Sequence, residues 1–170
     1  MLLKGKVHVF GDDINTDYII SNRYKLTIND EKEFVKHFME DIYPGFYKKI
    51  SKGDFIVGGE NFGCGSSRET APIIVKKSGI AAVIAKSFGR IFFRNSINIG
   101  LPVITCNTDL INDEEIISVD LENGTITTKT QSINITPLPN AMRKILFSGG
   151  LVNFVKNFKG DKKEIFDKIG

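Results

Sequence analysis

A short run of glycines, serines and an arginine is the part of this sequence best suited to chemistry. It reads Gly63-Cys64-Gly65-Ser66-Ser67-Arg68-Glu69 and lies between a strand-like and a helix-like stretch. Glycines let backbone N–H groups approach a ligand, and the start of a helix adds unpaired donors and a positive dipole end. Arg68 offers a planar fork that can bind a carboxylate through two hydrogen bonds. This combination predicts a site for a carboxylate or a phosphate.

Ser66 and Ser67 lie inside that predicted site. A serine hydroxyl is a poor base at neutral pH, so it needs strong stabilisation of its alkoxide. Clustered N–H donors and a nearby arginine provide that environment. The alternative is a capping box, in which Ser66 and Glu69 only begin a helix. Pro72 counts against this alternative because it would remove a hydrogen bond inside such a helix, so we expect the helix to start later.

Other kinds of site fit these residues less well. A Walker A loop needs a lysine after its last glycine, but Gly65 is followed by serine, and a dinucleotide-binding loop needs a third glycine where Arg68 stands. Cys64 as a nucleophile would need a histidine partner. His8 and His37 each lie in a periodic segment, which indicates a structural role.

The segments around the loop alternate between strand and helix patterns. The continuous apolar run at 80–85 is typical of a buried parallel strand, and the three- and four-residue spacing at 31–42 predicts an amphipathic helix. An Asn-Gly turn at 123–124 predicts a hairpin. We expect strands at 7–10, 54–59, 80–85, 103–106, 116–121 and 125–136, and helices at 31–42, from the loop to 77, at 87–99 and at 140–147. This order predicts an α/β fold with a parallel sheet.

Composition and charge limit the classes of function. The chain has 170 residues, 41% hydrophobic and 25% charged, which is typical of one globular domain. The net charge of +3 comes from scattered basic residues, so nucleic acid is not expected as a partner. No signal peptide is recognisable, and no run approaches the roughly 18 apolar residues of a membrane helix. We expect a cytoplasmic protein without membrane contact.

Three blocks of this sequence resemble the aconitase family. The run from Val57 to Glu69 is similar to the signature of the aconitase swivel domain, and the run from Ala81 to Asn95 is similar to a second block of that domain. The block Gly11-Asp12-Asp13-Ile14-Asn15-Thr16-Asp17-Tyr18-Ile19-Ile20 resembles the small subunits of 3-isopropylmalate dehydratase and homoaconitase. The blocks follow one another in family order over residues 4–106.

The resemblance implies a fold and a reaction. The fold would be the β/β/α type of the swivelling domain, with a largely parallel central sheet flanked by helices and an additional β-hairpin, over residues 1–170. The reaction would be the dehydration and rehydration of a 2- or 3-hydroxy acid by a heteromeric hydro-lyase. A [4Fe-4S] cluster on a large subunit would act as the Lewis acid. Cys64 and Cys106 alone cannot hold a cluster, so the chain itself is expected to bind no metal and to need an iron–sulfur partner.

The resemblance also implies roles for individual residues. Ser66 would be the general base that removes the proton next to a carboxylate, and Asp17 would orient or polarise a residue of the partner. Ser67 and Arg68 would bind the substrate carboxylate, with Gly65 beside them.

A specificity segment at about 21–30 would contact the variable end of the substrate. Leu26 suits an isopropyl group, whereas Arg23 or Lys25 suits a distal carboxylate. These residues do not decide between the two substrates. The resemblance implies 3-isopropylmalate dehydratase of leucine biosynthesis, the commoner activity of separate small subunits, with homoaconitase or a related malate-type dehydratase as the alternative. A stand-alone anion-binding or phosphate-binding module is the alternative of a different class. The tail at about 156–170 carries no interpretable motif.

Overall fold

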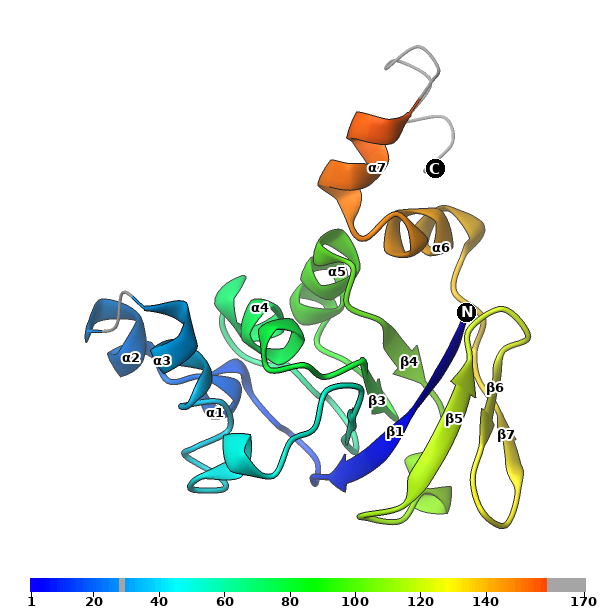
Figure 1. The fold of residues 1–170 in the computed structure, drawn as a ribbon, viewed down its shortest axis with the longest axis horizontal. Helices are drawn as coiled ribbons and strands as arrows, with labels where there is room; N and C mark the ends of the chain where they lie inside the picture. The colour runs from blue at the N-terminus through cyan, green and yellow to red at the C-terminus, as the bar shows by residue number, and fades with distance from the viewer. Residues whose placement is uncertain (28–29, 159–170) are drawn as a thin grey trace.

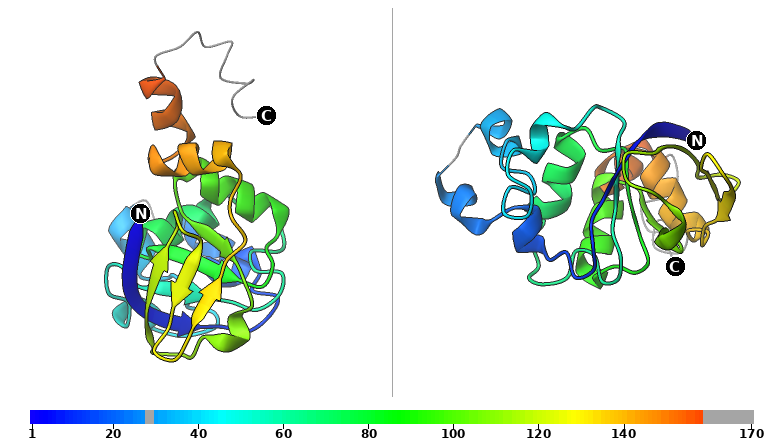
Figure 2. Two further views of the ribbon diagram at one scale, coloured as in Figure 1. Left: turned by 90° about the vertical axis from the view of Figure 1, so that its right-hand side faces the viewer. Right: turned by 90° about the horizontal axis from the view of Figure 1, so that it is seen from below.

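The computed structural model describes residues 1–27 and 30–158, with the backbone alone described at 25–27 and 31–32. The chain is an α/β protein in which helices pack against one curled sheet (Figures 1 and 2). The strands are β1 (Leu2–Val9), β2 (Phe55–Val57), β3 (Ala82–Ala85), β4 (Val103–Thr105), β5 (Ile116–Asp120), β6 (Thr125–Thr127) and β7 (Ser132–Asn134). The helices are α1 (Thr16–Ile19), α2 (Asn22–Thr27), α3 (Glu31–Val35), α4 (Thr70–Lys77), α5 (Arg90–Ile99), α6 (Asn140–Phe147) and α7 (Leu151–Asn157). Two short 3-10 helices, η1 (Phe46–Lys48) and η2 (Thr108–Leu110), complete the described elements.

The described strands form one sheet in the order β4-β3-β2-β1-β5-β6-β7. The pairings from β1 to β4 are parallel, and those from β1 through β5 and β6 to β7 are antiparallel. β1 joins the two parts, because residues 2–6 pair with β5 and residues 7–9 pair with β2. The predicted parallel sheet with an additional hairpin is confirmed, and the pairing of β1 with β5 makes the whole sheet mixed.

The core lies around the parallel strands. Every residue of β2 and β3 is buried, as expected for strands covered on both faces. α4 and α5 lie side by side, and α6 packs against α5 on the other side (Figure 1). α7 extends away from the sheet and has no buried residue. The predicted C-terminal tail from 156 falls mostly on residues 159–170, which lie outside the described residues.

The helix predicted at 31–42 is shorter than expected. α3 ends at Val35, and residues 36–42 form turns. The N–H of Met39 donates to the carbonyl of Ile19 (3.0 Å), and Met39 has a left-handed φ of 57°. Phe38 and Met39 are still buried. The apolar spacing therefore predicted correctly that these residues are buried. The helix does not continue, because the N–H of Met39 donates to α1 instead of to a carbonyl of the preceding helical turn.

Further boundaries differ from the predictions; the first strand, predicted at 7–10, is Leu2–Val9, and the strand predicted at 54–59 is Phe55–Val57. The stretch 125–136 is two strands, because the Thr128 hydroxyl accepts from the N–H groups of Thr130 (3.2 Å) and Gln131 (3.1 Å) and closes a turn between β6 and β7. The helix predicted at 87–99 begins at Arg90, since the residues before it bridge to the loop at Phe62. The predicted specificity loop contains α2, whose helical turns were not signalled by a clean period.

Candidate active site

The glycine-rich loop connects β2 to α4 and lies against the segment that follows β1. The N–H of Gly63 donates to the carbonyl of Ile14 (2.7 Å), and the N–H of Thr16 donates to the carbonyl of Cys64 (2.9 Å). The Thr16 hydroxyl also donates to the carbonyl of Ser66 (3.2 Å). Both segments follow parallel strands, so they meet at the carboxyl edge of the sheet, where ligands of α/β proteins usually bind.

Two positions in this loop require glycine. Gly63 has a φ of 76°, and a Cβ there would lie 2.2 Å from Cγ of Phe92. Gly65 has a φ of 100°, a region that side chains strongly disfavour. The loop can therefore turn sharply over α5 and bring the residues after Gly65 to the surface.

Asp17 and Arg68 meet at the exposed side of the loop. Asp17 lies in the first turn of α1, which is capped by the Asn15 side chain accepting from the N–H of Tyr18 (2.9 Å). Arg68 donates through Nη1 to the Asp17 carboxylate and to the carbonyl of Ile20 (3.4 Å). Arg68 is mostly buried, at 18% side-chain exposure, whereas Asp17 is 53% exposed. The structure thus brings together two predicted site residues that are far apart in sequence.

Ser66 and Ser67 are exposed beside this pair. α4 begins at Thr70 after Glu69, which makes no side-chain capping bond, so the capping box is not formed. Pro72 is the third residue of α4, where its missing N–H has no helical acceptor. Within the described residues, the N–H groups of Gly65, Ser66 and Ser67 have no hydrogen-bond acceptor. The later helix start is therefore confirmed, and Gly65, Ser66 and Ser67 are left exposed.

The cysteines do not form a metal site. Burial, together with the charge of Asp13, raises the pKa of the Cys64 thiol, and burial raises the pKa of Cys106 to about 11. Both are therefore protonated thiols near neutral pH. Among residues 1–27 and 30–158, no three His, Cys, Asp or Glu side chains gather where they could hold a metal ion. Within the same residues, no helix is long and apolar enough to cross a membrane.

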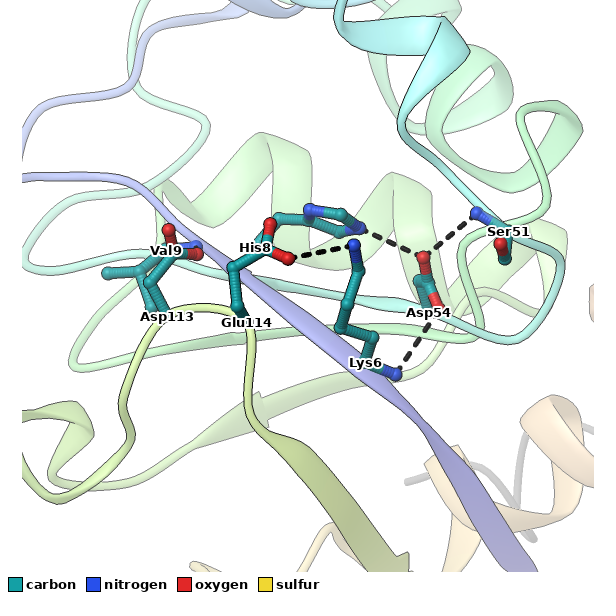
Figure 3. Close-up of polar contacts among 7 residues, drawn as sticks. All are labelled: Lys6, His8, Val9, Ser51, Asp54, Asp113 and Glu114. Atoms are coloured by element: carbon teal, nitrogen blue, oxygen red, sulfur yellow. Dashed lines mark hydrogen bonds and ion pairs between the residues drawn. The ribbon is translucent and has the colours of Figure 1, made fainter.

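His8, on β1, is part of a buried network with Asp54, the residue before β2 (Figure 3). Its Nε2 lies 2.9 Å from Oδ2 of Asp54, and both side chains are about 5% exposed or less. Asp54 also accepts from the N–H groups of Ser51 (2.8 Å) and Lys6 (3.2 Å). The ring of Phe46 contacts the His8 ring edge-on, with centroids 5.1 Å apart. The structural role predicted for His8 agrees with this burial.

The specificity segment follows α1, and its residues Arg23 and Tyr24 contact the turn after α3. Arg23 donates to the hydroxyl of Tyr24 (2.8 Å) and forms an ion pair with Asp41. The side chains of Lys25 and Leu26 lie outside the described residues. The structure thus pairs Arg23 with Asp41 but leaves its side chain 60% exposed, and the predictions for the other two residues stay open.

Sequence reasoning missed Thr16 and Asp41. Thr16 holds the loop through its N–H and hydroxyl, and Asp41 pairs with Arg23. An Asn-Thr-Asp sequence is typical of a helix start, so α1 could have been predicted from it. Nothing in the local pattern around Asp41 indicates its partner.

Comparison with known proteins identifies the family. The model of the aconitase C-terminal domain matches residues 12–108, which include the loop, α1 and α5. The chain belongs to the aconitase C-terminal domain family. The match covers the blocks on which the sequence resemblance rested, apart from Gly11, so that prediction is confirmed.

Individual relatives match over nearly their whole length. A protein of Archaeoglobus fulgidus named 3-isopropylmalate dehydratase small subunit 1 is 53% identical, covering 91% of this chain and 98% of the relative. The 3-isopropylmalate dehydratase small subunit of Brachyspira hyodysenteriae is 51% identical, with 94% and 100% covered. A crystal structure of 3-isopropylmalate dehydratase from Methanocaldococcus jannaschii superposes with a TM-score of 0.88 at 48% identity, covering 100% of both chains.

Proposed function

We propose that this protein is the small subunit of a 3-isopropylmalate dehydratase, a hydro-lyase that moves a hydroxyl between adjacent carbons by dehydration and rehydration. One observation carries the proposal. Asp17 of α1 lies against Arg68 beside the exposed serines of the glycine-rich loop, and all of them fall within the residues that match the family. Relatives of about 50% identity that bear this name support the choice of substrate.

Arg68 and the loop N–H groups are suited to hold a substrate carboxylate. The guanidinium of Arg68 is partly buried, so its interaction with an anion is less screened than at the open surface. The N–H groups of Gly65, Ser66 and Ser67 have no acceptor among the described residues and belong to exposed residues of the same loop. We assign carboxylate binding to Arg68 and Ser67, with the N–H of Gly65 beside them.

Ser66 is the group that we propose as the general base. Its hydroxyl is exposed and is not used to cap α4. Nearby N–H donors and the Arg68 cation favour an alkoxide over the neutral hydroxyl. The proton next to the bound carboxylate would pass to Oγ of Ser66. Asp17 holds Arg68 in place and is exposed enough to contact a partner residue.

The iron–sulfur cluster does not fit this chain. Cys64 and Cys106 are the two cysteines of the chain, fewer than a cluster needs, and the described residues gather no metal-binding group. We therefore propose an obligate large-subunit partner that holds a [4Fe-4S] cluster and faces the loop. The cytoplasmic location expected from the sequence stays a prediction.

Reconstitution with an iron–sulfur large subunit tests the function. We expect the isolated chain to be inactive and the mixture to convert 3-isopropylmalate. Loss of a general base typically lowers turnover by about 100-fold or more, so Ser66→Ala should do so without changing assembly. Ser132→Ala, an exposed serine on β7, is the matched control.

Three results would contradict parts of this proposal. Near-full turnover by Ser66→Ala would remove Ser66 as the base. Preference for homoaconitate in the same assay would reassign the substrate. Tight binding of phosphate or citrate by the isolated chain, with no activity on mixing, would favour a stand-alone anion-binding module.

A further inference from the structure

Thr16 is a buried hydroxyl residue that lies against the glycine-rich loop. It begins α1 and is only 2% exposed. Its N–H donates to the carbonyl of Cys64 (2.9 Å), and its hydroxyl donates to the carbonyl of Ser66 (3.2 Å). A Cβ at Gly65 would lie 3.3 Å from Oγ1 of Thr16, so the loop passes close to this hydroxyl. Thr16 therefore uses both of its donors to hold the loop.

The Thr16 hydroxyl holds a part of the loop that the backbone bonds do not reach. The backbone bonds between residues 11–16 and the loop end at Cys64, whose carbonyl accepts from Thr16. Among the described residues, the Thr16 hydroxyl is the one group of 11–16 that bonds to 65–67. Gly65 has a left-handed backbone (φ 100°), and a glycine can adopt many other conformations. Without the Thr16 hydroxyl, the peptide that follows Ser66 can therefore turn.

The bond from Thr16 also sets the direction of the Ser67 N–H. The carbonyl of Ser66 accepts from the Thr16 hydroxyl and from the N–H of Arg68 (2.8 Å), so it has two donors. The peptide bond between Ser66 and Ser67 is trans, since the described chain contains no cis peptide bond. In a trans peptide the carbonyl and the following N–H point in opposite directions. The Ser67 N–H therefore points away from buried Thr16, and it has no acceptor among the described residues.

We propose that Thr16 is a positioning residue for the dehydration, which keeps the Ser66 hydroxyl and the Ser67 N–H directed at the substrate. When the proton passes to Oγ of Ser66, the electron pair of the broken C–H bond first increases the negative charge of the neighbouring carboxylate. It then expels hydroxide from the adjacent carbon. A donor fixed at that carboxylate stabilises the transition state more than the ground state, so Thr16 acts on turnover rather than on substrate binding. The proposal rests on the function proposed above and deepens it.

Thr16→Val tests this role in the complex with the large subunit, because valine keeps the shape of threonine and lacks the hydroxyl. Turnover is expressed per assembled complex, which size-exclusion chromatography quantifies. We expect kcat for 3-isopropylmalate to fall about tenfold or more, with KM within about threefold of the original. Thr16→Ser restores the donor and should return kcat to within about twofold of the original.

Thr108→Val is the matched control, because it removes a buried hydroxyl donor of the same kind. The Thr108 hydroxyl donates to the carbonyl of Gly58 (3.0 Å), and the residue is 7% exposed and lies in η2, outside the loop and α1. Both valine variants should therefore shift the urea midpoint of the isolated chain alike. Only Thr16→Val should lose turnover.

Several outcomes would overturn the role of Thr16. They are an unchanged kcat in Thr16→Val, a loss that Thr16→Ser does not restore, and an equal loss in Thr108→Val. If Thr16→Val does not assemble, Thr16→Ala is measured, and failure of both would make Thr16 a folding residue and overturn the proposal. Inactivity of the unaltered complex on 3-isopropylmalate would instead refute the proposed function.

Discussion

Asp54 is a buried carboxylate that accepts hydrogen bonds from three groups. Burial alone would raise its pKa, but the N–H groups of Ser51 and Lys6 and the His8 imidazole donate to the charged form, and the net pKa is lowered. A lowered pKa in the folded state means that ionised Asp54 stabilises the fold above its unfolded pKa of about 3.9. That stabilisation is lost as the pH falls through the lower folded pKa.

Asp54→Asn should lower the free energy of unfolding at pH 7 by on the order of 2 kcal/mol, because it leaves buried donors poorly paired. The difference from the original protein should shrink as the pH falls below about 4, because Asp54 takes up a proton in the unfolded chain before it does so in the folded protein. Urea unfolding at several pH values measures both effects. A difference that stays constant down to pH 3 would show that the charge of Asp54 does not contribute.

At the scale of residues, the sequence predicts which side chains could take part in chemistry better than it predicts which side chains contact each other. Ser66 and Arg68 could be proposed because their residue types and spacing point to an anion site. The pairing of Arg68 with Asp17 and of Arg23 with Asp41 depends on where α1 and the turn after α3 pack. Those contacts join residues that no local pattern relates, so they could not be derived from spacing.

Among the elements, the turn at Gly63 and helix α5 depend on each other. The left-handed backbone of Gly63 and its contact with the Phe92 ring leave no room for a side chain. Gly63→Ala should cost about 2 kcal/mol or more from backbone strain and the clash, which lowers the unfolding midpoint by about 5 °C in a chain of this size.

Gly11→Ala is the matched control for that substitution. A Cβ at Gly11 meets no atom within 4 Å, so its unfolding midpoint should change little. Thermal unfolding followed by circular dichroism compares the two variants. Equal midpoints for both would mean that α5 moves aside at no cost and that Gly63 is not required by packing.

Element prediction succeeded where burial alone decides the structure. The apolar run at 80–85 contains β3, and the Asn-Gly turn lies between β5 and β6 as predicted. The helix predicted at 31–42 was too long, because the same apolar spacing also suits a short helix followed by buried turns. The bond from Met39 to Ile19, a non-local contact, decides between them.

For the whole molecule, β1 connects the parallel and antiparallel parts of the sheet. Its register with β5 could not be predicted, because β5 is more than a hundred residues away and many alternating segments would suit the same edge. We expect the amide hydrogens of β2 and β3 and of residues 7–9 of β1 to exchange slowest, because these strands are central and buried.

The amides of α7 should exchange much faster, since none of its described residues is buried. Hydrogen exchange followed by mass spectrometry or NMR, on the isolated chain, makes this comparison. Protection of α7 equal to that of β1 would contradict it. Protection of α7 that appears only in the complex would indicate that the partner covers it.

The bonds that fasten the glycine-rich loop to residues 14–16 have a consequence for association. The carbonyls of Ile14, Cys64 and Ser66 are all engaged, while the adjoining serine hydroxyls face solvent. A loop already ordered in this way loses little conformational entropy when a large subunit docks. The free energy of association between the two chains then does not have to offset ordering of the loop and can favour closure of the site.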